Sequence, residues 1–137
     1  MASIDLNRLE LVEVWPKSDP ERRVRFTFPI SAATGSTRSS VAYAELPGCG
    51  GSIPPHVDSA NEVVLVLVGP VDVEIDGKTE SVPTGGLVEI ASARKHSVTN
   101  RGPQTVRLVH FFDEADDVVT FDEPMMPLDR AVVGGTP

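Results

Sequence analysis

The fold of this chain is decided by two stretches, GGSIPPHVDSANEVVLVLVG at residues 50–69 and GGLVEIASARKHSVTN at residues 85–100. The first stretch contains a continuous apolar run, residues 63–68, which is typical of a strand covered on both faces. Between the two stretches lies Asp76-Gly77, the commonest kind of sequence for a two-residue hairpin turn. The pattern therefore predicts neighbouring antiparallel strands.

Apolar and polar residues alternate over most of the chain. The clearest half-buried strand is expected over residues 24–30, and further strands are expected at 9–14, 41–46, 71–75, 87–91, 97–100 and 106–112. Twelve prolines and eleven glycines interrupt these runs, as they do in sandwiches and barrels. No segment has apolar residues at helical spacing over three turns. We expect an all-β fold with fewer than about one residue in ten in helix.

Length and composition predict one globular domain. The chain has 137 residues, of which 40% are hydrophobic and 23% are charged, a balance typical of a single folded domain. We expect this domain to span residues 1–132, and residues 133–137 to form a disordered tail. The chain after Phe121 is rich in proline and acidic residues, and we expect it to be irregular.

Charge and cysteine content restrict the function classes. A formal net charge of −8 argues against a nucleic-acid binder, because nothing would neutralise the phosphates. A lone cysteine, Cys49, leaves no intramolecular disulfide and no cysteine-based zinc site in these 137 residues. No 18-residue apolar stretch is present, and the first fifteen residues carry acids where a signal peptide needs an apolar run. We expect a cytoplasmic protein with no membrane partner.

Four polar residues are expected to meet inside the barrel. His56 and Asp58 are two residues apart, so in a strand their side chains lie on the same face, and Glu62 shares that parity. His96 opens a later strand. In a small barrel, the face that these side chains share would point to the interior, where ionisable groups need partners. Two imidazoles with one or two carboxylates could bind iron, manganese, nickel or zinc and leave positions open for water or substrate.

The spacing of these residues resembles the two motifs of the cupin family, G-x5-H-x-H-x3-4-E-x6-G and G-x5-P-x-G-x2-H-x3-N. The fixed positions are held here by Gly50, His56, Asp58, Glu62 and Gly69, and then by Gly85, His96 and Asn100. Ala91 and Ala93 replace the proline and the glycine of the second motif, which changes only a turn. The resemblance implies a single cupin-type antiparallel β-barrel (a double-stranded β-helix or jelly roll).

The resemblance also implies a metal site. His56, Glu62 and His96 are the implied ligands, and Asp58 stands where the family has its second histidine. Asp58 could bind the metal, hydrogen-bond a ligand, or mark a site that has lost its metal. The expected cofactor is one divalent ion per subunit, with iron(II) favoured and zinc, nickel or manganese as alternatives.

The implied function is a metal-dependent enzyme acting on a small oxygen-bearing metabolite, in the first place an oxidoreductase of the dioxygenase type. Non-redox Lewis-acid chemistry (isomerase, polyketide-cyclase-like or lyase) and non-catalytic binding of a small ligand are the alternatives. The candidate acid/base residues are His110 and Glu62, although His110 could instead be a core histidine bonded to the backbone.

Three basic residues could serve anionic ligands. Arg94 and Lys95 flank His96 and could receive a carboxylate or enolate, or be solvated. His56, Asp58 and His96 also resemble the metal triad of iron/2-oxoglutarate oxygenases, for which Arg107 is the only candidate to bind the co-substrate.

The outward face of the apolar run is also apolar, with Val63, Leu65 and Leu67. Such a face must meet a second sheet or another subunit, because a continuous apolar stripe is seldom left wet. Small cupins commonly pair through such faces, so we expect a homodimer.

Overall fold

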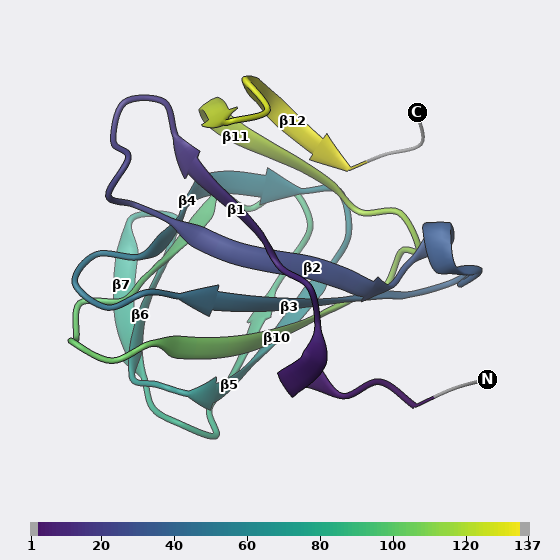
Figure 1. Cartoon of the computed structure of the whole chain (residues 1–137), viewed down its shortest axis with the longest axis horizontal. Coiled ribbons are helices and arrows are strands. Elements are labelled where there is room, and N and C mark those ends of the chain that lie inside the picture. The colour runs from purple at the N-terminus through teal and green to yellow at the C-terminus, as the bar shows by residue number, and fades with distance from the viewer. Residues whose placement is uncertain (1–2, 135–137) are drawn as a thin grey trace.

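Antiparallel strands form one continuous, nearly closed sheet in the computed structural model, which describes residues 3–134 (Figure 1). The strands are β1 (Val12–Pro16), β2 (Val24–Ile30), β3 (Ser40–Leu46), β4 (Ser52–Asp58), β5 (Glu62–Val68), β6 (Val71–Ile75), β7 (Lys78–Val82), β8 (Leu87–Ile90), β9 (His96–Thr99), β10 (Val106–Phe112), β11 (Val118–Met126) and β12 (Arg130–Gly134). Within the described residues the helices are two short 3₁₀ turns, η1 (Leu6–Arg8) and η2 (Ala32–Thr34). The predicted all-β fold is confirmed, and neither described helix has the length to cross a membrane.

The strand order is β7-β6-β9-β4-β11-β1-β2-β3-β10-β5-β8, and β12 pairs with β11. Two sets of strands therefore face each other across the interior. One contains β2, β3, β10 and β5, and the other contains β6, β9, β4 and β11 (Figure 1). The main apolar core fills the space between them, and its largest fully buried members include Leu46, Ile90, Leu108 and Met125.

Alternation along β4 and β5 carries polar residues into this core. Every second residue of β4 is buried, which places His56 and Asp58 inside. β5 follows the same rule and buries Glu62 at its start. Across the sheet, β4 pairs His56 with His96 of β9, and β5 pairs Val64 with His110 of β10. Strand register therefore brings all of these polar side chains to one end of the barrel interior.

The hairpin between β6 and β7 agrees with its sequence. Asp76 has φ 50° and Gly77 has φ 82°, and both values lie in the left-handed region that the tightest hairpin turns require. The predicted turn is confirmed.

The C-terminal part differs from the expectation of irregular structure after Phe121. β11 continues to Met126, because it pairs with β12 along one edge and with β4 and then β1 along the other. These backbone hydrogen bonds outweigh the unfavourable local sequence. Val133 and Gly134, expected to be disordered, end β12 and pair with β11. The rest of that expected tail, residues 135–137, lies outside the described residues.

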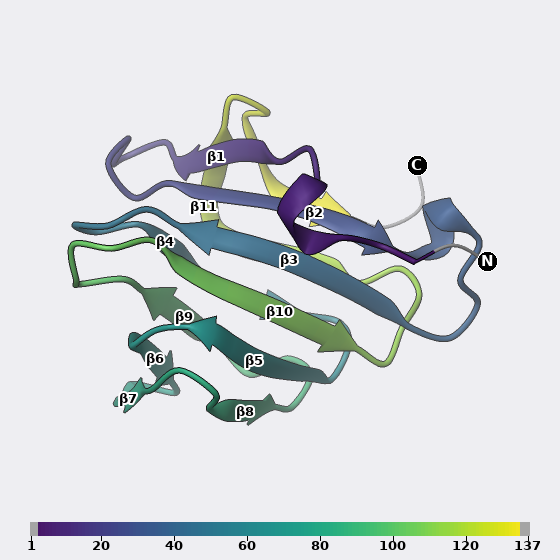
Figure 2. The same cartoon turned by 60° about the horizontal axis from the view of Figure 1, so that its bottom comes forward.

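The outer face of β10, β5 and β8, which lie side by side in Figure 2, carries an apolar strip. Leu87 is 68% exposed and Phe111 is 44% exposed. Leu65 pairs with Leu87 and Val63 with Phe111, so the four residues are neighbours across three strands. The homodimer stays a prediction, and this strip is the surface that supports it.

Asn100 joins the end of β9 to two neighbouring loops. Its side chain is buried, and its Nδ2 donates to the carbonyl oxygens of Leu46 (2.9 Å), Pro47 (3.2 Å) and Gln104 (2.7 Å). Its Oδ1 accepts from the backbone N–H of Gly102 (3.0 Å). One amide therefore satisfies backbone groups of both loops, which explains why an asparagine ends the second motif.

We predict that Asn100→Ala lowers the free energy of unfolding by about 2–4 kcal/mol, because several buried backbone groups lose their partner. Urea denaturation followed by circular dichroism measures the change. The control is Thr105→Ala, at an exposed position of the same loop, which should change stability by less than about 0.5 kcal/mol. Equal effects of the two substitutions would contradict the assigned role.

Candidate metal centre

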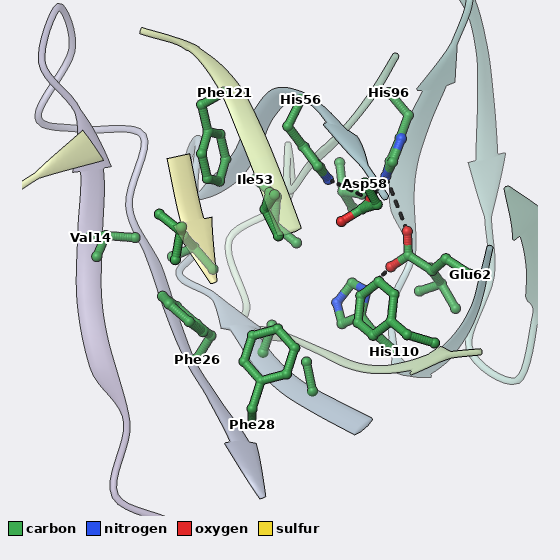
Figure 3. Close-up of a pocket in the computed structure, with 18 residues that line it drawn as sticks. Val14, Phe26, Phe28, Ile53, His56, Asp58, Glu62, His96, His110 and Phe121 are labelled. Carbon is green, nitrogen blue, oxygen red and sulfur yellow. Dashed lines mark hydrogen bonds and ion pairs between the residues drawn. The ribbon is translucent and has the colours of Figure 1, made fainter. Parts of the chain in front are cut away.

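The barrel interior contains a cavity of about 70 Å³ whose polar and apolar lining residues are separated. Figure 3 shows the polar side chains together at one end, with aromatic and aliphatic side chains around the rest. The polar group consists of His56, Asp58, Glu62, His96 and His110, all of them buried. Five buried ionisable side chains in one place need a specific arrangement of charge.

Backbone carbonyls fix the orientation of two imidazoles. Nδ1 of His56 lies 2.7 Å from the carbonyl oxygen of Pro54, and Nδ1 of His96 lies 2.8 Å from that of Arg94. A carbonyl oxygen can only accept, so each Nδ1 carries the hydrogen. In a neutral ring the lone pair is then on Nε2, the atom that faces the cavity.

Both Nε2 atoms face one oxygen of Asp58. Oδ2 of Asp58 lies 3.4 Å from Nε2 of His56 and 3.2 Å from Nε2 of His96. This Oδ2 is buried and has no hydrogen-bond donor among the described residues. With neutral rings, three lone pairs point at one another in a site removed from water. The arrangement calls for a cation between them.

The spacing of the three atoms fits a divalent ion. The donor atoms of His56, Asp58 and His96 lie within 4.8 Å of one another. Metal bonds of about 2.1 Å place neighbouring ligand atoms about 3.0 Å apart in an octahedron and about 3.4 Å apart in a tetrahedron. The two distances to Asp58 agree with these values, so the residues present can hold such an ion.

Glu62 lies beside this group and connects it to His110. Its Oε1 is 3.1 Å from Nε2 of His96, and its Oε2 is 2.6 Å from Nδ1 of His110. The contact with His110 follows from the register of β5 and β10, which pairs Glu62 with Phe112, two residues along from His110. Glu62 is outside the set of three mutually close donors, so its role as a ligand stays a prediction.

Burial and hydrogen bonding oppose each other in the cluster. Burial alone would raise the pKa of Asp58 and of Glu62, but the histidines that face Asp58 and hydrogen-bond Glu62 outweigh it and lower both pKa values. Burial would lower the pKa of His96, but Asp58 and Glu62 raise it to about 10. In the absence of a metal, a proton on Nε2 of His96 therefore supplies the positive charge.

His110 presents a free nitrogen to the cavity. Because Glu62 is ionised, Nδ1 of His110 donates to it, and Nε2 is left with the lone pair. Nε2 is buried and has no hydrogen-bond partner within residues 3–134. The ring stacks on Phe112 at 6.2 Å and 8°. The alternative of a core histidine bonded to the backbone is wrong, because the bonding partner of Nδ1 is a carboxylate.

The turn before β9 keeps its form despite the missing glycine of the motif. Ala93 has φ 63°, in the left-handed region, and its N–H donates to the carbonyl oxygen of Asp58 (3.0 Å). Holding alanine in this conformation costs about 1–2 kcal/mol. The turn thus still supports the backbone of Asp58.

The cupin domain family matches residues 43–112, which include all five polar residues of the cavity. This match covers about half of the chain. The chain belongs to the cupin family. The resemblance seen in the two sequence motifs is confirmed.

Solved structures share the fold of this cupin. The polyketide cyclase RemF from Streptomyces resistomycificus is 22% identical with a TM-score of 0.68, over 82% of this chain and 78% of that one. The EutQ protein of Clostridium difficile is 19% identical with a TM-score of 0.64, over 82% and 86%. Oxalate oxidase in complex with the substrate analogue glycolate is 24% identical with a TM-score of 0.63, over 77% and 57%. The cupin barrel is thereby confirmed, and the neighbours include enzymes of several kinds. No curated protein matches the sequence.

Asp117 is a member of this cupin's site that the sequence did not reveal. Its Oδ1 accepts from the backbone N–H of Ala60 (3.1 Å) and from Oγ of Ser59 (3.4 Å). Burial, then the hydrogen bond and negative charge of Asp58, raise the pKa of Asp117 to about 8. It therefore carries a proton at neutral pH. Its position beside Asp58 depends on the pairing of β11 with β4, and no local sequence signal marks it.

The basic residues considered for anionic ligands lie elsewhere. Arg94 and Lys95 are exposed and form ion pairs with Asp76 and Asp122. Arg107 hydrogen-bonds other side chains, and none of the three basic residues lines the cavity. The interpretation as a 2-oxoglutarate oxygenase therefore lacks an arginine for its co-substrate.

The metal-free protein is predicted to lose stability as the pH rises. Asp117 has a pKa raised from 3.8 to about 8, so the folded chain holds a proton that the unfolded chain releases between these values. The contribution of His96 is complete below its ordinary pKa of 6.5 and is lost as the pH rises through about 10. Thermal denaturation of chelator-treated protein should show Tm falling from about pH 6 to about pH 9.

Asp117→Asn keeps a donor toward Asp58 but cannot ionise, so it should make the fall in Tm shallower below about pH 8. The exposed Asp129→Asn is the matched control and should leave the fall unchanged. A wild-type slope in Asp117→Asn would disprove the protonated state of Asp117.

Proposed function

We propose that this cupin is a metal-dependent enzyme that transfers a proton on a small carbonyl compound, in a reaction of the isomerase, cyclase or lyase kind. The observation that carries the proposal is Nε2 of His110, a buried basic atom at the cavity with no partner within the described chain. A divalent ion held by His56, Asp58 and His96 would polarise the carbonyl oxygen as a Lewis acid.

The chain supplies the base and its support. Nε2 of His110 accepts a proton from the carbon next to the carbonyl group. Glu62, 2.6 Å from Nδ1, orients the ring and stabilises the imidazolium that forms, as the carboxylate of a catalytic triad does. The same imidazolium then returns the proton to another atom of the substrate. The apolar lining around this dyad keeps water away from the reacting carbon.

Asp58 is proposed as a metal ligand in preference to Glu62. Its Oδ2 faces both Nε2 atoms. Glu62 approaches only Nε2 of His96, and its second oxygen accepts from Nδ1 of His110. Glu62 therefore serves the base more directly than the metal. One hard oxygen donor and two imidazoles form a ligand set that suits zinc, iron(II), nickel or manganese.

Zinc affinity should separate the two carboxylates. Asp58→Asn replaces the central ligand atom and should weaken zinc binding at least about 100-fold, and His96→Ala should abolish it. Glu62→Gln should weaken it by about tenfold or less, because it alters only the surroundings of the ligands. Competition with a fluorescent chelator at pH 7.5 measures all three. If Glu62→Gln has the larger effect, the ligand assignment is wrong.

Proton transfer can be measured without knowledge of the natural substrate. Zinc-loaded protein should accelerate exchange of the methyl protons of acetophenone in D2O, followed by NMR. His110→Gln should reduce the rate by about 100-fold or more, with zinc content unchanged. Phe111→Leu, on the outer face of the same strand, should retain the wild-type rate. Exchange that survives in His110→Gln would contradict the role of His110.

A dioxygenase-type reaction is the second candidate. Two histidines and one carboxylate are the ligand set typical of non-haem iron oxygenases, and oxalate oxidase is among the similar folds. Oxygen consumption by iron(II)-loaded protein with the same ketone would favour it. Proton exchange that persists under argon would favour the first candidate.

A further inference from the structure

We propose that the substrate is a neutral, mainly aromatic molecule that presents an uncharged oxygen, as a ketone, enol or phenol, to the polar end of the cavity. The inference rests on the proposed function for the role of that oxygen and names the class of molecule that carries it. Carboxylic acids are excluded as good ligands.

The charge of the cavity leaves no place for an anion. Asp58 and Glu62 place two buried carboxylates at the polar end, and one divalent ion would balance their charges. Among the described residues no lysine or arginine lines the cavity, and Arg94 and Lys95, which precede His96, form ion pairs with acidic partners outside. A substrate carboxylate would therefore be buried without a compensating charge, which is strongly unfavourable.

Four phenylalanine rings form part of the walls, beside aliphatic side chains. Phe28 stacks on Phe112 at 6.0 Å and 27°, and Phe26 meets Phe28 edge-on at 6.2 Å. On the other side, Phe121 lies 5.3 Å from the ring of His56. Figure 3 shows Phe26, Phe28 and Phe121 on the side of the cavity away from Glu62. The free faces and edges of these rings can make further stacked or edge-on contacts with an aromatic ligand.

The mouth of the cavity is apolar and its floor is polar. The lining residues that retain partial exposure include Phe26, Phe28, Phe121 and Val133, whereas the ionisable residues are buried. The volume of about 70 Å³ is room for a few water molecules. A ligand thus inserts its oxygen-bearing end and leaves its apolar body among the rings of the mouth. A polar floor and an apolar mouth together suit an aryl ketone or a phenol, which has an oxygen at one end and a ring at the other.

Acetophenone and benzoate test the charge argument, because they have the same ring and differ in a methyl group against a carboxylate oxygen. NMR titration of zinc-loaded protein at pH 7.5 should give binding at least about tenfold tighter for acetophenone. Oxalate, an anion without a ring, should not bind detectably. Equal or tighter binding of benzoate or oxalate would overturn the inference.

Val133→Lys provides a test by gain of binding. Val133 lines the mouth and is partly exposed, so its replacement brings a cation to the cavity at small cost in burial. Benzoate should then bind about tenfold tighter than to the wild type. Val132→Lys is the matched control, since the neighbouring residue is 49% exposed and does not line the cavity. An equal gain in both variants would show that only net charge matters.

The aromatic wall is tested by Phe28→Leu, which should weaken acetophenone binding about threefold to tenfold. Phe111→Leu, on the outer face, is its control and should have no effect. If Phe28→Leu fails to fold, as judged by circular dichroism, Phe26→Leu takes its place. An unchanged affinity in a folded wall variant would remove the ring argument.

Zinc content, measured on the same samples, keeps this inference separate from the proposed function. If the protein takes up zinc but does not prefer acetophenone, the inference on substrate class fails and the metal site stands. If it takes up no zinc yet still prefers acetophenone over benzoate, the proposed metal-dependent function fails and the inference on substrate class stands.

Discussion

One buried carboxylate oxygen determines how the interior of this cupin is organised. Oδ2 of Asp58 lies within 3.4 Å of two imidazole nitrogens whose hydrogens are committed to backbone carbonyls on the far side of each ring. Acceptors that face one another away from water repel unless a proton or a metal ion lies between them. The negative charges around this oxygen favour the binding of such a proton or metal ion.

The same oxygen accounts for the state of its neighbours. His96 holds a proton far above the ordinary pH range of imidazole because two carboxylates face it, and Asp117 keeps its own proton because Asp58 is already negative. The proton on His96 and a metal ion would occupy the same place, so they exclude each other. An aspartate at the position where the family has a second histidine therefore adds a negative charge that the rest of the cluster offsets, with no lysine or arginine of residues 3–134 in the cavity lining.

Period-two patterning was sufficient to predict β5 and β10, which form close to the expected residues and bury the expected parity. It failed after Phe121, where pairing with β4 and β1 outweighs a proline-rich and acidic sequence. Parity also placed His56, Asp58 and Glu62 on one interior face. It could not show which carboxylate lies between the imidazoles, nor reveal Asp117, because those facts depend on side-chain direction and on long-range strand pairing.

The strands divide the tasks of the site between them. β4 and β9 carry the three metal-ligating candidates, β5 and β10 carry the Glu62–His110 dyad, and β2, β11 and β12 contribute the apolar mouth. Register within the first two pairs fixes the position of His110 relative to the three candidate ligands, and a shift by one residue would turn these side chains outward. The strands of the mouth are free of that constraint. Their side chains can therefore change the molecules admitted while the polar end stays the same, which is how one barrel can serve enzymes of several kinds.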